Sequence, residues 1–400
     1  MNAPAELPAA VPAARRAGRV QGSLIREILK VTQRPGMISL AGGLPAPQSF
    51  PADALRAALD AVLATQADSA LQYSSTEGDP ALRSWIAAQE TARGVPTAPE
   101  QVLVVSGSQQ ALDLIGKAMV EEDTPLLVGS PTYLGALQAF APFGPVLRTL
   151  PGDAHGLLPQ AIDAKLAAGA RLAYVMPNFQ NPTGETIDAD RRAALAAGAR
   201  RFDFWLIEDD PYGELWYRQA PPPSLRRWAP ERTLRLCSFS KVLAPGLRLG
   251  YAVGPQAAID LLARLKQATD LHTATLTQRV VARLLNDGLL DAHLPRVRAL
   301  YAAQAAAMLG SLRAYMPAGV RWTEPEGGMF VWLTLPARID TLRLLDRAID
   351  HGVVFVPGVP FYAGEPERHT LRLSFVTVPA ERIDRGIATL ARLIAEETRR

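Results

Sequence analysis

Seven short apolar runs, mostly separated by helical stretches, constrain the fold of this chain most strongly. They lie at residues 102–105, 125–129, 146–150, 171–177, 205–208, 234–239 and 249–253. Helical patterns separate several of them, at residues 109–120, 134–141 and 188–201. Because continuous apolar runs fit strands that are covered on both faces, this alternation predicts an α/β domain with about seven strands, mostly parallel, between helices.

The C-terminal part has a different pattern. Long helices are expected at residues 255–287 and 293–315, and the helix near 260–287 is expected to be a hinge. Beyond them, expected strands at 327–335, near 353 and at 371–375 alternate with helices at 341–351 and from 379 onward. We therefore expect a large domain at residues 51–285 and a smaller α+β domain at 286–400.

The N-terminal region is read in two parts. Residues 1–20 are rich in alanine and proline and are predicted to be a disordered tail. Residues 21–50 are expected to form an arm that packs with the small domain, because apolar residues at 24, 25, 28 and 29 have helical spacing. The pair Gly42-Gly43 in the following loop allows a close approach of the backbone to another group.

Composition excludes several classes of protein. The chain has 400 residues, 48% of them apolar, and a net charge of +3 without a dense basic run, so we expect no nucleic-acid partner. Nothing approaches the roughly 18 consecutive apolar residues of a membrane span, so no membrane partner is expected. Cys237 is the single cysteine, which suits a cytoplasmic protein, and the five histidines lack a metal-binding spacing.

Polar motifs directly follow several expected strands, where ligands of such sheets bind. Ser108 and Gln109 would lie at a helix N-terminus, which favours a phosphate, although Ser108 could be an ordinary helix cap. Tyr133 could lie flat against a pyridine ring, or else pack on the core. Asn181 could donate its amide to a phenolate oxygen.

Asp209 and Tyr212 follow the strand that ends near Ile207. A carboxylate beside a pyridine nitrogen keeps it protonated, which makes the ring an electron sink, and Tyr212 could reach the 3′-oxygen of such a ring. The alternative is that Asp209 and Asp210 bind Mg²⁺ together with a phosphate. No Walker-type Gly-Lys-Ser/Thr element supports that alternative.

Lys241 is the candidate reactive amine, because it stands just after the apolar run 234–239 and before a turn. Ser238 and Ser240 offer hydroxyl donors, and Arg248 offers a planar cation suited to phosphate. An amine beside a phosphate cradle suggests pyridoxal phosphate. An exposed lysine at a strand end is the alternative.

Together these motifs resemble the fold-type I pyridoxal-phosphate aminotransferases of class I/II. The resemblance rests on Ser-Gly-Ser-Gln-Gln, Pro-Thr-Tyr, Asn-Pro-Thr-Gly, Asp-Asp-Pro-Tyr and Ser-Phe-Ser-Lys with Gly-Leu-Arg, in that order, and it covers the chain after residue 20. The segments 23–30, 33–36 and 41–47 resemble the 2-aminoadipate and kynurenine aminotransferase branch.

The resemblance implies a role for each matching residue. Lys241 would form a Schiff base with the cofactor and carry the substrate proton, Asp209 would pair with the pyridine nitrogen, and Tyr133 would stack on the ring. Asn181 and Tyr212 would hold the 3′-oxygen. The phosphate would be held by Ser108, Gln109, Ser238, Ser240 and Arg248, with Tyr73 reaching the site of a neighbouring subunit in a homodimer. The substrate would be held by Arg372, Asn181, Arg26 and Gly43.

The function implied is transfer of an amino group from an L-amino acid to 2-oxoglutarate by a ping-pong mechanism. The donor would resemble 2-aminoadipate, with aromatic and branched-chain amino acids as further candidates. One alternative is another pyridoxal-phosphate reaction, such as β-elimination. The other is a non-catalytic regulatory module, although the roughly twenty residues before the first helix are too few for a DNA-binding domain.

Overall fold

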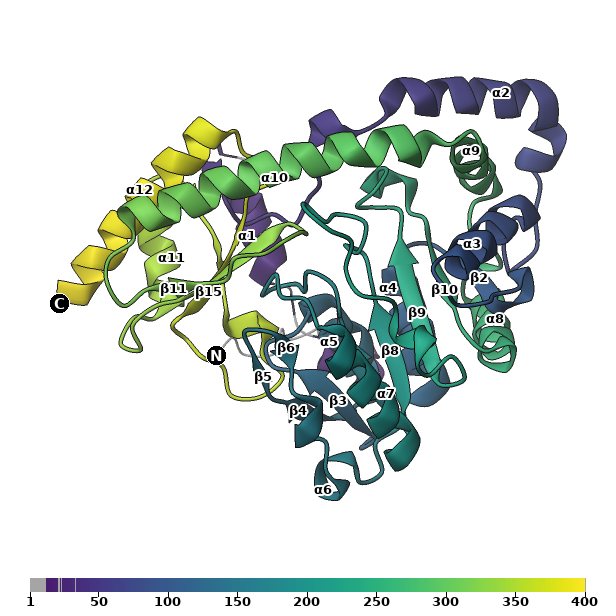
Figure 1. Cartoon of the computed structure of the whole chain (residues 1–400), viewed down its shortest axis with the longest axis horizontal. Coiled ribbons are helices and arrows are strands. Elements are labelled where there is room, and N and C mark those ends of the chain that lie inside the picture. Colours follow the sequence, from purple (N-terminus) through teal and green to yellow (C-terminus); the bar gives the residue numbers. More distant parts are fainter. Residues whose placement is uncertain (1–11, 21, 23, 33, 400) are drawn as a thin grey trace.

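The computed structural model describes residues 12–399 except 21, 23 and 33. Its centre is a seven-stranded sheet with the order β2-β10-β9-β8-β7-β3-β4 (Figure 1). Strand β10 is antiparallel to both of its neighbours, and the remaining pairs are parallel. The predicted α/β class and its mostly parallel sheet are therefore confirmed. The strands are β2 (Val102–Val105), β3 (Pro125–Gly129), β4 (Val146–Leu150), β7 (Leu172–Val175), β8 (Trp205–Asp209), β9 (Thr233–Ser238) and β10 (Gly250–Val253).

Both faces of this sheet are buried, which explains the continuous apolar runs. Leu126 and Tyr174 belong to the core cluster that includes residues of α4 and α5, whereas Leu127 and Val175 belong to a second cluster with α7. Neighbouring residues of one strand thus serve opposite layers. The helices of this part are α2 (Ala52–Ala70), α3 (Pro80–Ala92), α4 (Ser108–Met119), α5 (Leu134–Phe140), α6 (Ala164–Ala167) and α7 (Ala189–Phe202), and a small hairpin joins β5 (Gly152–Asp153) to β6 (Gly156–Leu157).

A second, antiparallel sheet of four strands has the order β11-β12-β15-β14. The long helix α10 (Leu289–Tyr315) runs from beside α9 at the large sheet to α12 beside the small one (Figure 1). The other elements of this part are β11 (Arg321–Trp322), β12 (Phe330–Thr334), α11 (Thr341–Asp350), β13 (Val353–Val354), β14 (Val356–Pro357), β15 (Thr370–Ser374) and α12 (Ala380–Arg399).

The N-terminal arm is tied to the C-terminal part of the chain. After helix α1 (Leu24–Val31), strand β1 (Ile38–Ser39) pairs in parallel with β13. Residues 1–11 of the predicted tail lie outside the described part of the chain. Arg15–Arg19 form a short 3-10 helix, and Arg19 forms an ion pair with Glu122, so this part of the tail is ordered, unlike the prediction.

The prediction of one continuous helix at 255–287 is wrong. Two helices occupy this span, α8 (Gln256–Asp270) and α9 (Thr275–Asn286), and Leu271 between them has φ = 67°. The Asp270 carboxylate accepts hydrogen bonds from Lys266 (2.6 Å) and from Gln110 at the start of α4 (2.7 Å). Because these bonds hold the end of α8 to the β2–α4 turn, the chain turns there. The helix that connects the two sheets is α10.

Candidate active site

A cavity of about 360 Å³ lies beyond the carboxyl ends of β7, β8 and β9. Every site residue predicted from the sequence lines it except Arg26 and Tyr73. It is bordered by residues of both sheets and of the N-terminal arm, since Arg372 comes from β15 and Gly43 from the loop after β1. The predicted strand-end motifs therefore meet at one place.

Lys241 occupies the turn after β9, and its half-buried side chain lines the cavity. The Nζ atom donates a hydrogen bond to the carbonyl oxygen of Gly43 at 3.0 Å. Burial, followed by the cations Arg372 and Arg248, lowers the pKa of Lys241 to about 8. A substantial share of this amine is neutral near pH 8, so it can act as a nucleophile or a base.

Asp209 is the last residue of β8, and its side chain is buried. Its Oδ2 atom accepts a hydrogen bond from the Tyr174 hydroxyl at 2.7 Å, while Oδ1 is buried without a hydrogen-bond partner. Burial raises the pKa of Asp209 to about 7. A buried carboxylate oxygen without a donor fits a ligand that supplies one, such as a protonated ring nitrogen.

Another part of the cavity wall is suited to hold an anion. Gly107, with φ = 85°, caps helix α4, and the first two residues of the helix, Ser108 and Gln109, line the cavity, where a helix N-terminus favours an anion. A Cβ atom on Gly107 would lie 2.6 Å from Nη2 of Arg248. Arg248 has φ = 47° and donates to the Ser106 carbonyl at 3.2 Å. Ser238 and Ser240 complete this wall.

Arg372 is a buried cation held by neutral acceptors. It donates to Oδ1 of Asn181 at 2.6 Å and to the Ala41 carbonyl at 2.8 Å, and its Nε has no partner. Its guanidinium carbon lies 4.2 Å from the centre of the Phe330 ring and 5.0 Å from that of Phe361. Burial lowers the pKa of Arg372 to about 10. Such a cation is suited to a carboxylate ligand.

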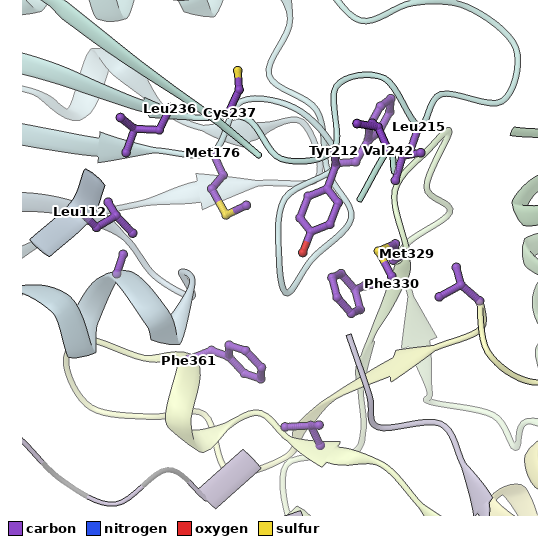
Figure 2. Packing of buried hydrophobic residues seen from close by; sticks show 14 of the residues in the cluster. Leu112, Met176, Tyr212, Leu215, Leu236, Cys237, Val242, Met329, Phe330 and Phe361 are labelled. Atoms are coloured by element: carbon purple, nitrogen blue, oxygen red, sulfur yellow. The ribbon is translucent and has the colours of Figure 1, made fainter. Parts of the chain in front are cut away.

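Aromatic side chains close the site between the two sheets. Figure 2 shows Tyr212, Phe330 and Phe361 around one region of the core, with Met176 beside them. The Tyr212 and Phe330 rings meet edge to face with their centres 5.8 Å apart. Burial is the main cause that raises the pKa of Tyr133 to about 12, and it also raises the pKa of Tyr212. Both phenols therefore remain neutral donors at pH 7.

Two predicted residues lie outside this cavity. Arg26 is exposed on α1, and Leu29, one turn later, lines the cavity instead. Tyr73 is 77% exposed in the loop between α2 and α3, with its ring edge against His272.

Three contributors were missed by the sequence reasoning. The Tyr174 hydroxyl holds Asp209, the Phe330 ring lies over Arg372, and Leu29 lines the cavity. Tyr174 carried a detectable signal, because it is a hydroxyl inside an apolar strand and stands two residues before Met176, on the same strand face. No local pattern indicated the contact of Phe330 with Arg372, which joins two strands of the small sheet.

The donors of the site suit an organic phosphate rather than a metal. No group of three or more His, Cys, Asp or Glu side chains within the described residues could hold a metal ion. An amine of lowered pKa, an anion cradle and an unpaired carboxylate oxygen around one cavity are the groups that an aldehyde-bearing, phosphorylated pyridine requires. The fold and site thus define a pyridoxal-phosphate enzyme of the α/β type.

The comparisons with known proteins agree with this class. The chain belongs to the aminotransferase class I and II family, whose model matches residues 37–390. It is 43% identical to a 2-aminoadipate transaminase from Thermus thermophilus, over 94% of this chain and 95% of that protein. It is 41% identical to aromatic-amino-acid aminotransferase 1 of Thermococcus litoralis, over 95% of this chain and 93% of that protein.

A solved structure shares the whole architecture. The kynurenine aminotransferase of Pyrococcus horikoshii, in complex with PMP, superposes with a TM-score of 0.93 at 40% identity, covering 96% of this chain and 97% of that one. The chain is therefore an amino-acid aminotransferase of the fold-type I class, and its cofactor is pyridoxal phosphate. β-Elimination and a non-catalytic regulatory role are not favoured.

Proposed function

We propose that this enzyme transfers the amino group of 2-aminoadipate-like L-amino acids to 2-oxoglutarate, and that it also accepts aromatic or branched-chain donors. The observation that carries the proposal is Arg372, a buried cation aimed into the cavity and held by neutral acceptors, which suits the α-carboxylate common to these substrates. The relatives that act on 2-aminoadipate and on aromatic amino acids support the range of donors.

The cofactor, when bound, supplies an electron sink for the negative charge that develops at the substrate Cα. We propose that Asp209 Oδ1 holds its ring nitrogen, that Tyr133 stacks on the ring, and that Asn181 and Tyr212 hold its 3′-oxygen. Its phosphate would be bound by Ser108, Gln109, Ser238, Ser240 and Arg248.

Lys241 is proposed to bind the cofactor covalently and to move the substrate proton. Its Nζ atom would accept the proton from Cα and deliver it to the aldehyde-derived carbon of the cofactor, two atoms away from Cα, since its pKa of about 8 allows both directions near neutrality. Arg372 and the aromatic rings around it would orient the Cα–H bond and exclude water.

The test is a half-reaction with a panel of amino donors. Purified enzyme is mixed with each L-amino acid without an acceptor, and the cofactor absorbance and the 2-oxo acid formed are measured. We expect bleaching of the cofactor band with 2-aminoadipate and recovery on adding 2-oxoglutarate. Lys241→Ala should fold and bind cofactor but release no oxo acid. Turnover by this variant, or pyruvate and ammonia from suitable donors without an acceptor, would contradict the proposal.

The position of Arg26 bears on the choice of donor. Arg26 and Gly43 are proposed to meet the substrate, with Arg26 reaching from α1 toward a side-chain carboxylate. Leu29 on the same helix already lines the cavity, so a turn of α1 toward the site would bring Arg26 closer. The test is the ratio of kcat/KM for 2-aminoadipate to kcat/KM for leucine. If Arg26→Ala leaves this ratio unchanged, Arg26 has no part in the selection of the amino donor.

We also propose a homodimer in the cytoplasm. Leu71 is 68% exposed and Tyr73 77% exposed in one loop, an apolar surface that a second copy of the chain would cover. The cytoplasmic proposal rests on the single cysteine, Cys237, which is buried as a free thiol. Within the described residues, no helix is both long and apolar enough to cross a membrane.

A further inference from the structure

We propose that Tyr174 is a positioning residue that keeps Asp209 ionised and leaves its Oδ1 atom free for the ring nitrogen of the cofactor. The inference rests on the role proposed above for Asp209. It adds a residue that touches neither substrate nor cofactor in that role and acts only through the carboxylate.

The two residues face each other because of the strand register. Strands β7 and β8 are parallel, and Tyr174 lies opposite Ile207. Asp209 stands two residues beyond Ile207, so all three side chains project from the same face of the sheet. Tyr174 and Asp209 are each 1% exposed, and Oη donates to Oδ2 at 2.7 Å. The edge-to-face contact of the Tyr174 ring with Phe140 of α5, at 6.4 Å, helps to fix the phenol.

The hydrogen bond from Tyr174 gives the two carboxylate oxygens of Asp209 different roles. Oδ2 is occupied by the phenol, so the carboxylate plane is fixed, and Oδ1 is left without a donor at the edge of the cavity. A carboxylate free to rotate would lose conformational freedom on binding the ring nitrogen. Preorganisation by Tyr174 removes that loss.

The same bond opposes neutralisation of the carboxyl group. Burial and the neighbouring charge of Asp210 raise the pKa of Asp209, whereas the Tyr174 hydrogen bond lowers it, and the balance is about 7. Asp210 cannot replace Asp209 as the partner of the ring nitrogen, because the Asp210 carboxylate forms an ion pair with Arg235 at 2.6 Å. Without the phenol, the balance at pH 7 would shift to the protonated acid, which cannot stabilise a positive ring nitrogen.

The test is the protonation state of the ring nitrogen. Enzyme loaded with pyridoxal phosphate labelled with ¹⁵N in the ring is observed by NMR, and the cofactor dissociation constant is measured by titration of apoenzyme. In Tyr174→Phe we expect the ¹⁵N resonance to move toward the unprotonated position and the dissociation constant to rise about tenfold or more, as for loss of a hydrogen bond to a charged group. With 1-deazapyridoxal phosphate, which has C–H in place of the nitrogen, the two proteins should bind equally.

The matched control is Tyr301→Phe. It removes the same atom from another fully buried tyrosine, whose hydroxyl accepts from the backbone of Ala46 at 3.0 Å, and it should leave the ¹⁵N resonance in place. A second probe, 3-fluorotyrosine at position 174, keeps the hydroxyl and makes it a stronger hydrogen-bond donor. The ring nitrogen should then stay protonated to a higher pH, as shown by its ¹⁵N resonance.

The outcomes separate this inference from the proposed function. If Asp209→Asn leaves the nitrogen protonated, the role of Asp209 itself is wrong. If Asp209→Asn moves the resonance but Tyr174→Phe does not, only the role of Tyr174 is overturned. An equal loss of affinity for the deaza analogue would also overturn it, because the tyrosine would then act on the fold rather than on the nitrogen.

Discussion

At the scale of single residues, the site depends on ionisable side chains that lie in the protein interior without a partner of opposite charge. Arg372 has neutral acceptors, Asp209 has one free oxygen, and Lys241 donates to a backbone carbonyl. Each of these groups would be costly to bury in a protein that had no ligand for it. Their convergence on one cavity is therefore stronger evidence of function than any single motif.

The lowered pKa of Lys241 leads to a prediction about cofactor capture. Only the neutral amine attacks an aldehyde, so the rate at which apoenzyme recombines with pyridoxal phosphate should rise with pH, with a midpoint at about pH 8, and then level off. Arg372→Gln removes a cation that favours the neutral amine, so the midpoint should move to higher pH. Stopped-flow absorbance across pH 6 to 10 measures it. Arg283→Gln, on the exposed surface of α9, is the control and should keep the midpoint of the unmodified enzyme.

The close approach at Gly107 gives a second prediction. A Cβ atom there would press on Arg248, and φ = 85° is strained for alanine, so Gly107→Ala should weaken pyridoxal-phosphate binding by at least tenfold. Isothermal titration of the apoenzyme measures the affinity. Gly310→Ala is the matched control, because a Cβ atom at this position of α10 would meet nothing within 4 Å beyond its chain neighbours and the backbone of its own helix, and it should bind cofactor normally. Equal affinities in both variants would show that the turn at Gly107 can relax.

At the scale of elements, a buried ionic cluster joins the helices to the strand ends that carry the site. Glu90 of α3 pairs with Arg226 and Arg235, and Arg235 of β9 also pairs with Asp210, the residue after β8. All four charged groups are buried, so each depends on the others for compensation. Adjacent aspartates thus have different tasks: Asp209 faces the cavity and Asp210 faces this cluster.

Removing the central charge of that cluster should destabilise the fold. Glu90→Gln removes the carboxylate that pairs with the buried Arg226 and leaves the buried Arg235 with its pair to Asp210, and we expect the free energy of unfolding to fall by about 3–5 kcal/mol. Urea unfolding followed by circular dichroism measures the change. The control is Glu231→Gln, which breaks an exposed pair with Arg200 and should cost no more than about 1 kcal/mol. A loss at Glu90 as small as this would mean that water compensates the arginines.

The elements also show what the sequence could predict. Strands buried on both faces leave continuous apolar runs, so all seven strands of the large sheet and the motifs at their ends were predictable. The break after α8 was not, because apolar spacing continues on both sides and the turn depends on Asp270 reaching Gln110, far away in the sequence. The contact of Tyr174 with Asp209 depends on which strands are neighbours, and that order is a property of the sheet.

At the scale of the whole molecule, the active site is assembled from distant parts of the chain. The N-terminal arm supplies Gly43, the large sheet supplies Lys241 and Asp209, and the small sheet supplies Arg372. Lys241 donates to Gly43, and Arg372 donates to Ala41, so the arm is held against both sheets by side chains of the site itself. Tyr73 does not line this cavity and is 77% exposed, and a second copy of the chain is its proposed partner.

A mixing experiment tests whether two subunits share their sites. Tyr73→Ala weakens the proposed phosphate contact to the neighbouring subunit, and Lys241→Ala inactivates a subunit's own site. In a heterodimer of the two variants, one site carries both defects, but the other has an intact lysine and receives an intact tyrosine. At limiting cofactor, unfolding and refolding the mixture should therefore restore about a quarter of the unmodified activity, because half of the dimers are mixed and each has one good site. Light scattering shows whether the refolded mixture is dimeric. If it is dimeric but only as active as the average of the two single variants, Tyr73 does not contribute to the active site of the neighbouring subunit.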